Sequence, residues 1–391
     1  MSENNEELKK LAYLAIISFG LISLFGDIIY EGARGIVPTY LMFLGATALI
    51  VGLVGGLGEF LGYSLRLVSG YLADTTRSYW LFVFLGYGLL ISIPLLAFTG
   101  YWQIAIILVL IERIAKALRA PARDTIFSVV TKGVGTGKAF GLHEFMDQLG
   151  AISGPLIVAT VLYFTGNKYF YAFLILLVPY LFLIIILSSV YVKMKLYTKT
   201  MLSTLQKNVG SGETRLPSGF KFYTFAVILN TAGLIHVSLI LYIASNIMFP
   251  WMVAILYLML QGIDAIIAPF SGYVYDKTGR SILLIPFVLS VIPTIFALMG
   301  TFSSVIIAAL FFGIILGMQE SIYRAAVSDL TPIEKRGTAY GIFNAAYGFG
   351  FLISGFLFGY FIDYGLFLQA IVFSVLMQVV ALVFLFRSVR S

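Results

Sequence analysis

The chain has 391 residues, of which 60% are hydrophobic and only 11% are charged, and its mean hydropathy is +0.99. A soluble domain carries about 25% charged residues, so this composition excludes an ordinary soluble protein. The net charge is +7, and the lack of cysteine leaves neither disulfides nor thiolate chemistry to consider. We therefore expect an integral membrane protein.

Apolar windows of roughly 20 residues, long enough to form bilayer helices, follow one another in two groups. The first group spans residues 11–37, 47–72, 80–99, 102–122, 139–164 and 169–192. The second spans residues 219–245, 249–274, 281–300, 303–327, 338–362 and 366–386. We expect an all-α membrane protein with twelve transmembrane helices, in an N-terminal bundle (1–192) and a C-terminal bundle (219–391). Residues 193–218 are the predicted cytoplasmic linker, in which 196–209 fit either a basic amphipathic helix or a flexible tether.

Basic residues are distributed unevenly along this pattern. Of the 25 lysines and arginines, 20 lie in or beside the N-terminal tail, the even-numbered connections and the C-terminal tail. Only Lys168 lies in a connection on the other side. Because basic residues concentrate on the cytoplasmic side, we expect a multi-pass protein of the cell (plasma) membrane with both termini in the cytoplasm. This placement favours contact with anionic lipids and argues against a nucleic-acid partner.

Two blocks of sequence repeat at an offset of about two hundred residues. The first is Gly70-Tyr-Leu-Ala-Asp74 with Arg77, repeated as Gly272-Tyr-Val-Tyr-Asp276 with Arg280. The second is Gly137-Lys-Ala-Phe-Gly141 with Gly150, repeated as Gly337-Thr-Ala-Tyr-Gly341 with Gly350. Two matches at one spacing indicate a duplicated protein with pseudo-symmetric halves, which is the architecture of alternating-access transporters.

These motifs resemble those of the major facilitator superfamily. The loop at 70–74 resembles its signature between helices 2 and 3, and 272–280 resembles the echo between helices 8 and 9. Arg113 resembles the buried arginine of its second motif, and Gly141, Gly150, Gly154 and Pro155 have the spacing of a motif associated with proton-coupled antiporters (the efflux branch). The chain departs from these patterns at Thr75, Arg77, Ser78, Lys116, Ala117 and Val158-Ala159.

Ionisable residues at membrane depth fall on the first, second, fourth, fifth, eighth and tenth predicted helices. The third, sixth, ninth and twelfth, which the resemblance places at the lipid-facing periphery, carry none. Charge inside a bilayer is costly, so charged residues persist there only beside a partner or a water-filled cavity. We therefore predict a proton-coupling and substrate cavity. The alternative is a set of buried ion pairs that only stabilise the fold. Its residues in the first half are Asp27, Glu31, Arg34, Glu59, Arg66, Glu112, Arg113, Lys116, Arg119, His143, Glu144 and Asp147.

The second half offers few acids and many amides and phenols. Such groups suit an organic ligand, although aromatic residues on helices more often pack against other helices. The predicted contributors are Gln261, Asp264, Gln319, Glu320, Tyr323, Asn344 and Tyr347.

The repeated loops predict a gate. By the resemblance, Asp74 would face the start of a helix at 336–338 and Asp276 one at 136–138, since a helix N-terminus attracts an acid. Each contact would exist only with the cytoplasmic side shut. Gly150, Gly154 and Pro155 would let a neighbouring helix approach closely. The predicted gating residues are thus Gly70, Asp74, Arg77, Gly272, Asp276, Arg280, Gly150, Gly154 and Pro155.

The function expected is secondary active transport, with export of a small organic molecule in exchange for H⁺ by a functional monomer without cofactors. A proton symporter or uniporter importing a metabolite is the alternative, and a metal-ion exporter using Asp27, Glu31 and Glu59 is a weaker one. A receptor or enzyme on this scaffold is disfavoured, because the chain shows no hydrolase pattern. The stretch Gly133-Val-Gly-Thr-Gly-Lys138 lacks the first glycine and the Ser or Thr of a phosphate loop. We predict no resident metal site, because His143 and His236 are far apart in sequence.

Overall fold

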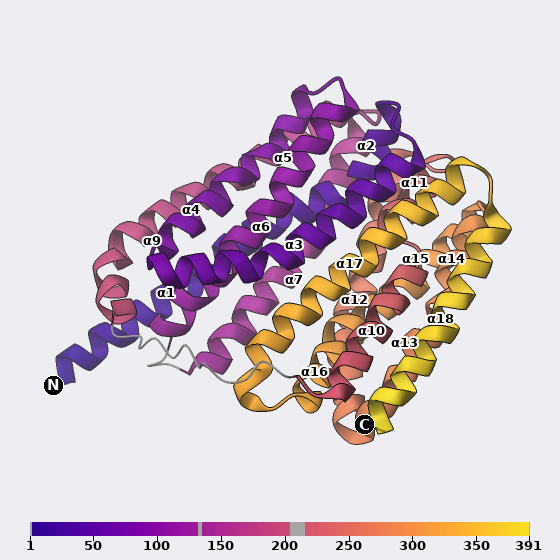
Figure 1. Cartoon of the computed structure of the whole chain (residues 1–391). Helices are drawn as coiled ribbons and strands as arrows, with labels where there is room; N and C mark the ends of the chain where they lie inside the picture. The colour runs from indigo at the N-terminus through magenta and orange to yellow at the C-terminus, as the bar shows by residue number, and fades with distance from the viewer. Residues whose placement is uncertain (1, 132–134, 204–215, 391) are drawn as a thin grey trace.

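The computed structural model describes residues 2–131, 135–203 and 216–390, and every element in these ranges is helical (Figure 1). The elements of the first half are α1 (Ser2–Arg34), α2 (Val37–Phe43), α3 (Ala48–Thr76), α4 (Tyr79–Gly88), η1 (Leu89–Ile91), α5 (Ser92–Leu95), η2 (Leu96–Phe98), α6 (Trp102–Val130), α7 (Thr136–Phe164), α8 (Tyr169–Leu174) and α9 (Leu177–Ser203).

The second half repeats this all-helical pattern. Its elements are α10 (Ser218–Gly233), α11 (Val237–Ser245), α12 (Pro250–Thr278), η3 (Gly279–Leu283), α13 (Leu284–Leu289), α14 (Val291–Leu298), α15 (Phe302–Met318), η4 (Gln319–Tyr323), α16 (Arg324–Leu330), η5 (Ile333–Lys335), α17 (Arg336–Asp363) and α18 (Phe367–Arg390). The turn η4 is π-helical, and the other η elements are 3₁₀ turns.

Within the described ranges, ten helical stretches are long and apolar enough to cross a membrane. One of them, Pro250–Leu298, contains α12, η3, α13 and α14, so it is much longer than one crossing requires. The helix α6 is not among the ten, although it has 29 residues, because it carries many charged side chains. The chain is therefore a multi-pass membrane protein of all-α class, and the count of twelve crossings stays a prediction.

Several helices continue past the predicted apolar windows on the side that carries the linker. The helix α3 ends at Thr76, α6 at Val130 and α9 at Ser203, so the first residues of the predicted linker are helical. Helix α9 includes the start of the proposed amphipathic segment, and residues 204–215 lie outside the described residues. Polar residues can stay helical where water reaches the helix, and a hydropathy window does not register them.

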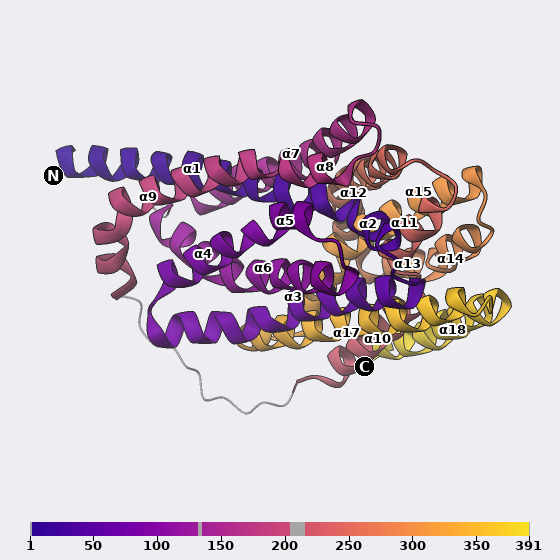
Figure 2. The same cartoon turned by 90° about the horizontal axis from the view of Figure 1, so that it is seen from above.

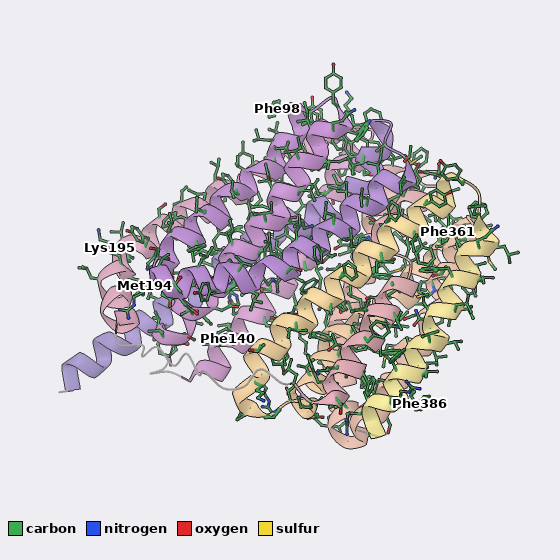
Figure 3. The ribbon with its side chains drawn as sticks, in the orientation of Figure 1. Phe98, Phe140, Met194, Lys195, Phe361 and Phe386 are labelled. Carbon is green, nitrogen blue, oxygen red and sulfur yellow. The ribbon has the colours of Figure 1, made fainter. Side chains whose placement is uncertain are left out.

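The buried apolar side chains form two clusters that follow the two halves of the sequence. One cluster draws on residues from Ala15 to Met194 with Ala254, and the other on residues from Phe220 to Leu385 with Ala48. Large apolar residues such as Phe98 and Phe386 instead point outward, with 67% and 51% of their surface exposed (Figure 3). In a membrane protein such an outer apolar surface contacts lipid rather than water.

Two seams join the halves, α3 with α17 and α7 with α12, and they lie on opposite faces of the molecule (Figure 2). In the first seam the backbones touch: a Cβ atom on Gly355 would lie 2.0 Å from the carbonyl oxygen of Gly52. A Cβ atom on Gly359 would lie 2.7 Å from the carbonyl oxygen of Ala48. Only glycine permits this approach, so the α3–α17 seam depends on small residues, as membrane helix contacts often do.

The seams are capped at one end, which we call the far end; it carries the connections from α2 to α3 and from α17 to α18. Asp363, the last residue of α17, accepts hydrogen bonds from the backbone N–H groups of Ala48 (2.8 Å) and Leu49 (2.9 Å), where α3 begins. At the start of α12, the N–H of Trp251 donates to Asn167 (3.4 Å). We call the opposite end, where α3 ends and α7 begins, the terminal end.

Candidate functional site

A cavity of about 390 Å³ is lined by side chains of both halves. This volume lies within the range of roughly 300–1,000 Å³ typical of small-molecule sites. The lining is unusually rich in charge for a membrane interior. Its acids are Asp27, Glu31, Glu59, Glu112, Asp124, Glu144, Asp147, Asp264 and Glu320. Its arginines and lysines are Arg34, Arg66, Arg113, Lys116, Arg119, Arg123 and Arg324.

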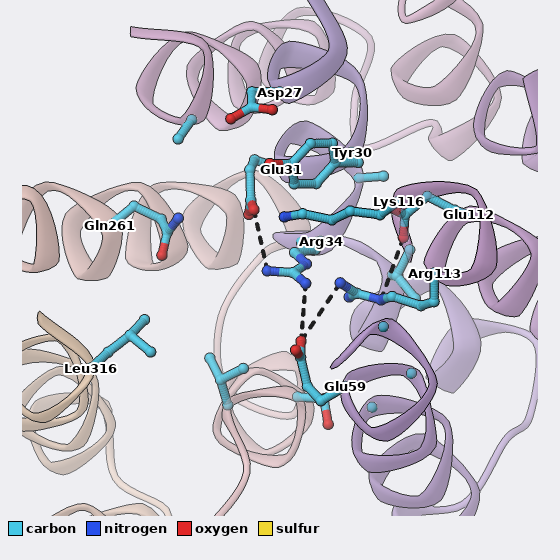
Figure 4. A pocket seen from close by; sticks show the side chains of 18 of the residues that line it. Asp27, Tyr30, Glu31, Arg34, Glu59, Glu112, Arg113, Lys116, Gln261 and Leu316 are labelled. Carbon is cyan, nitrogen blue, oxygen red and sulfur yellow. Dashed lines mark hydrogen bonds and ion pairs between the residues drawn. The ribbon is translucent and has the colours of Figure 1, made fainter. Parts of the chain in front are cut away.

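A chain of ion pairs crosses the first half of the cavity (Figure 4). The guanidinium of Arg34 lies 3.2 Å from the carboxylate of Glu31 and 2.9 Å from that of Glu59. The guanidinium of Arg113 lies 3.6 Å from the same oxygen of Glu59, and its Nε lies 3.3 Å from Glu112. Three carboxylates therefore share two guanidinium groups, so one negative charge is left over when all five groups are ionised.

The chain of ion pairs reaches the second half through Tyr257 of α12, whose hydroxyl donates to Oε2 of Glu31. Local geometry explains why Glu31 faces this way. Asp27, Glu31 and Arg34 are spaced by four and three residues on α1, so they share one helix face. The same face of α1 thus carries an acid, an ion pair and a contact to the opposite half.

Three bases of the cavity contact aromatic rings instead of acids. Lys116 Nζ lies 4.0 Å from the ring centroid of Tyr30, and the guanidinium carbon of Arg119 lies 5.5 Å from that ring and 5.0 Å from Tyr87. Arg66 lies 5.2 Å from the ring of Tyr63. Among the described side chains none of these three bases has an acid within 4 Å. A cation–π contact contributes about 0.5–2 kcal/mol, and it leaves the donor hydrogens free.

The α7–α12 seam supplies acids to the cavity and no base. Glu144 and Asp147 come from α7, and Asp264 comes from α12. Asp264 has only 4% of its surface exposed, and its Oδ1 has no hydrogen-bond partner among the described residues. Because an unpaired polar atom is costly when buried, this carboxyl group is a strong candidate for binding something that enters the cavity.

His143 does not line the cavity, contrary to the expectation from sequence. It is 4% exposed and packs beside Phe127, with 5.2 Å between the ring centroids. The neighbouring residues Glu144 and Asp147 do line it. Successive helical residues are rotated by about 100°, so His143 points from α7 towards α6 while Glu144 points into the cavity. The distance from His143 Nε2 to Asp147 is 3.8 Å, which is too long for a hydrogen bond.

The predicted residues of the second half separate into two groups. Gln261, Asp264, Glu320 and Tyr347 line the cavity. Gln319 and Tyr323 instead bind the Oδ1 of buried Asn230, at 3.2 and 2.8 Å, inside the second core. Asn344 lines a small neighbouring cavity together with Gln319 and Tyr347. The π-helical turn η4 explains part of this split, because it adds one residue to the turn and rotates the side chains that follow.

Other cavity residues were missed from sequence. They include Arg123, Asp124 and Arg324, as well as Tyr30, Tyr63 and His236. The sequence places these two bases in or beside cytoplasmic connections, but α6 continues to Val130 and carries Arg123, and Arg324 begins α16. The sequence contains a signal that could have placed Arg123 in the cavity, because Arg113, Lys116, Arg119 and Arg123 follow one another at helical spacing.

The repeated loops lie at the terminal end, and among the described residues no ion pair joins Asp74 to Arg336 at the start of α17. Asp74 is exposed and accepts a hydrogen bond from the hydroxyl of Tyr79 (2.9 Å), while Arg336 donates to the carbonyl of Ser328 (3.0 Å). Asp276 is also exposed, and the side chains of Thr136 and Lys138 lie outside the described residues. This arrangement is the one expected when the terminal side is open.

The two loops both end on a residue with positive φ but differ in ψ, which is 21° at Arg77 and −152° at Gly279. Arg77 ends α3 with a φ of 53°, and Gly279 ends α12 with a φ of 63°. Both lie in the left-handed region, which favours glycine. Gly70 faces Pro121 and Gly272 faces Ser321, whereas Arg280 lies in the turn η3 after the second loop.

The glycine motif of α7 brings that helix against α1. A Cβ atom on Gly150 would lie 2.6 Å from the carbonyl oxygen of Leu24, and one on Gly154 would lie 2.5 Å from that of Ile28. Pro155 follows within the same uninterrupted helix. This close packing is next to Asp27 on α1, so a shift of α7 would be felt directly at the acidic part of the cavity.

No three His, Cys, Asp or Glu side chains in the described part of the chain are grouped closely enough to hold a metal ion. In the acidic set considered for a metal path, the guanidinium of Arg34 lies between Glu31 and Glu59. A cation at that place would be repelled by the arginine.

Sequence comparisons find one matching family description and related proteins that align over most of the chain. The family description "Major Facilitator Superfamily" matches residues 218–391. An uncharacterized protein of Mycobacterium tuberculosis is 36% identical over 343 residues, which cover 86% of this chain and 84% of that protein. An uncharacterized transporter of the same superfamily type from Methanocaldococcus jannaschii is 29% identical over 361 residues, covering 89% and 87%.

Three solved structures with a similar fold are distant in sequence. The nucleoside transporter NupG has a TM-score of 0.71 at 14% identity, with 95% of this chain and 98% of that chain covered. A peptide transporter, POT, has a TM-score of 0.69 at 14% identity, with 98% of each chain covered. A D-xylose-proton symporter has a TM-score of 0.64 at 15% identity, with 95% and 96% covered. At this identity the similarity establishes the fold and leaves the substrate open.

Proposed function

We propose that the chain is a transporter of the major facilitator superfamily and that it exports a small organic molecule in exchange for protons. It is a transport protein and not an enzyme. The chemistry to explain is therefore how proton binding and substrate binding exclude each other in one cavity that opens alternately to two sides.

The observation that carries the proposal is the sharing of Arg34 and Arg113 among three carboxylates (Figure 4). A proton that binds Glu59 would remove the charge that holds both guanidinium groups. Arg34 would then keep only Glu31, and Arg113 only Glu112. Protonation of one residue thus changes two ion pairs, and any substrate group that binds these arginines would compete with Glu59.

The link from Glu31 to Tyr257 extends the effect to the second half. The phenol of Tyr257 donates to a carboxylate, and a proton on Glu31 would remove its charge and weaken the bond. Because α1 and α12 belong to opposite halves, that bond differs between conformations in which the halves separate differently. A contact specific to one state is what allows a bound proton to shift the equilibrium between states.

Export by antiport is supported by the α7 glycine motif, which packs against α1 at Asp27. The alternative is a proton symporter, which would use the same acids but move the substrate with the protons, or a uniporter, in which a proton gradient would drive no substrate movement. These mechanisms are separated by whether, and in which direction, the substrate moves when a proton gradient is imposed on liposomes that contain the protein.

The experiment requires a ligand, which a thermal-shift screen over metabolites can supply, because a bound ligand raises the unfolding temperature. In proteoliposomes with a proton gradient, we expect the ligand to move against the proton flux. Glu59→Gln should abolish this gradient-driven movement, and Asp329→Asn, a change to an exposed acid that is bound by Tyr275 outside the cavity, should not. Movement of the ligand with the protons, or full coupling in Glu59→Gln, would refute the proposal.

A further inference from the structure

The cavity holds charges of both signs that do not pair with one another. Its bases Arg66, Lys116, Arg119 and Arg324 have no acid within 4 Å among the described side chains. By the same criterion, Asp27, Glu144, Asp264 and Glu320 have no base. Unpaired charges at membrane depth are costly and mark functional sites by default.

Most of these charges are carried by different helices, and the exception is Glu320 and Arg324, which follow one another on η4 and α16. The bases Arg66, Lys116 and Arg119 come from α3 and α6, which pack together. The acids Glu144, Asp147 and Asp264 come from the α7–α12 seam, whose residues in the cavity include no base. Figure 2 shows this seam on the face of the molecule opposite to α3. The α7–α12 side of the cavity is therefore acidic, whereas the α3–α6 side carries the unpaired bases Arg66, Lys116 and Arg119 beside acids that have ion-pair partners.

One group of each sign is buried with a free polar atom. Arg119 is 3% exposed, and its Nη1 has no partner among the described residues, although its guanidinium is held between the rings of Tyr30 and Tyr87. Asp264 is 4% exposed with its Oδ1 free of any partner in the same part of the chain. Both line the cavity, so each can bind a charged group that enters it.

Apolar residues lie between the charged groups. Leu260, Phe312 and Leu316 line the cavity from the second half, and Figure 4 shows Leu316 beside Gln261, opposite the ion pairs. A ligand with an apolar body would contact these side chains while its charged ends reach the two walls.

We propose that the transported molecule is a small zwitterion of the amino-acid or short-peptide class, with a carboxylate bound at Arg119 and Lys116 and an amine bound at Asp264. This inference rests on the proposed transport function, and it adds the substrate class. A zwitterion carries both charges, so a molecule long enough to reach both groups pairs with the base and with the acid at once. A purely cationic or purely anionic ligand leaves one of the two groups unpaired.

The test uses the twenty amino acids and a set of dipeptides, each also as its N-acetyl form and its methyl ester. Thermal stabilisation of the purified full-length protein reports binding. We expect at least one zwitterion to bind, and its two blocked forms to bind about tenfold to hundredfold more weakly, as for the loss of a charged hydrogen bond. No stabilisation by any zwitterion, or equal stabilisation by a methyl ester or an N-acetyl form, would overturn the proposal.

Two variants assign the ends of the ligand. Arg119→Gln should remove the preference for the free carboxylate over the methyl ester and keep the preference for the free amine. Asp264→Asn should do the reverse. The exposed residues Lys221 and Asp329 lie outside the cavity lining, and Lys221→Gln and Asp329→Asn should alter neither preference. If each cavity variant lowers binding of all forms equally, the assignment of the two ends is wrong.

Failure of this inference can be distinguished from failure of the transport proposal. A zwitterion that binds but moves independently of a proton gradient would leave the substrate class standing and refute proton coupling. A ligand of another class that exchanges with protons would refute the substrate class alone.

Discussion

Removing the carboxylate of Asp363 should open the far end of the molecule. Asp363 accepts two hydrogen bonds from the first turn of α3, from Ala48 at 2.8 Å and from Leu49 at 2.9 Å. An acid at a helix start contributes about 0.3–1 kcal/mol through the helix dipole, and a hydrogen bond to a charged group contributes about 1.5–3 kcal/mol when protected from water. Because Asp363 is exposed, we take about 2 kcal/mol for the whole contact.

This contact joins the two halves, so it stabilises only conformations in which the far end is shut. Asp363→Ala removes it entirely and should raise the far-end-open population about thirtyfold, since 1.4 kcal/mol corresponds to a factor of about ten. Asp363→Asn keeps one acceptor and loses the charge, so about half of the energy is lost and the population should rise about fivefold. The ordering of the two variants is itself part of the prediction.

Thiol labelling can measure this population, because the chain has no cysteine. Leu239 of α11 is fully buried and contacts the α3–α17 seam at Gly52, so Leu239→Cys should react with a maleimide only when the far end opens. The matched control is Asn246→Ala, a change to an exposed polar residue whose side chain binds the carbonyl of Tyr242 within its own segment. Equal labelling rates in the unaltered reporter protein and in its Asp363→Asn and Asp363→Ala variants would refute the reasoning.

Three further predictions concern the opposite gate and the two halves. Asp74→Asn should shift the population towards the terminal-end-open state, seen as faster labelling of a Gly141→Cys reporter, and an unchanged rate would count against the latch. Gly355→Ala places a methyl group 2.0 Å from a backbone oxygen of Gly52, so we expect the protein to lose at least about 2 kcal/mol of stability and to unfold at a lower Tm. Gly88→Ala is the control, because its added methyl group meets nothing within 4 Å and should leave Tm nearly unchanged. Equal changes in Tm for the two variants would contradict the close contact of α3 and α17 at Gly52 and Gly355. Asn230→Leu leaves Gln378, Gln319 and Tyr323 without their hydrogen bonds to Asn230. This should lower the free energy of unfolding by about 2–4 kcal/mol. An unaltered Tm would show that these buried hydrogen bonds do not stabilise the fold.

Much of the cavity could be anticipated from sequence because charge is so rare in these helices. Asp27, Glu31 and Arg34 share one face by helical spacing alone, and Glu59 and Arg113 were expected to face inward. The structure brings all five to one cavity. Hydropathy failed at one helix end, because Arg123 lies just beyond the apolar window 102–122 but on a helix that continues to Val130 and lines the cavity.

The pairings could not be anticipated. Nothing in the spacing of Glu59 indicates that it is shared by Arg34 and Arg113, or that Tyr257 reaches Glu31 across the halves. Likewise His143 and Glu144 are adjacent in sequence, and only the rotation of α7 against its neighbours decides that one packs in a core while the other lines the cavity.

The sequence by itself determined that this protein is an all-helical membrane protein, and it predicts duplicated halves with the charges on inward helices. These properties follow from composition and periodicity, which depend on each residue and its near neighbours along one helix. Only the tertiary structure decided which acids pair and which bases stay free. Those properties depend on contacts between helices far apart in sequence, and a distance of a few ångströms separates an ion pair from two unpaired charges that can bind a ligand.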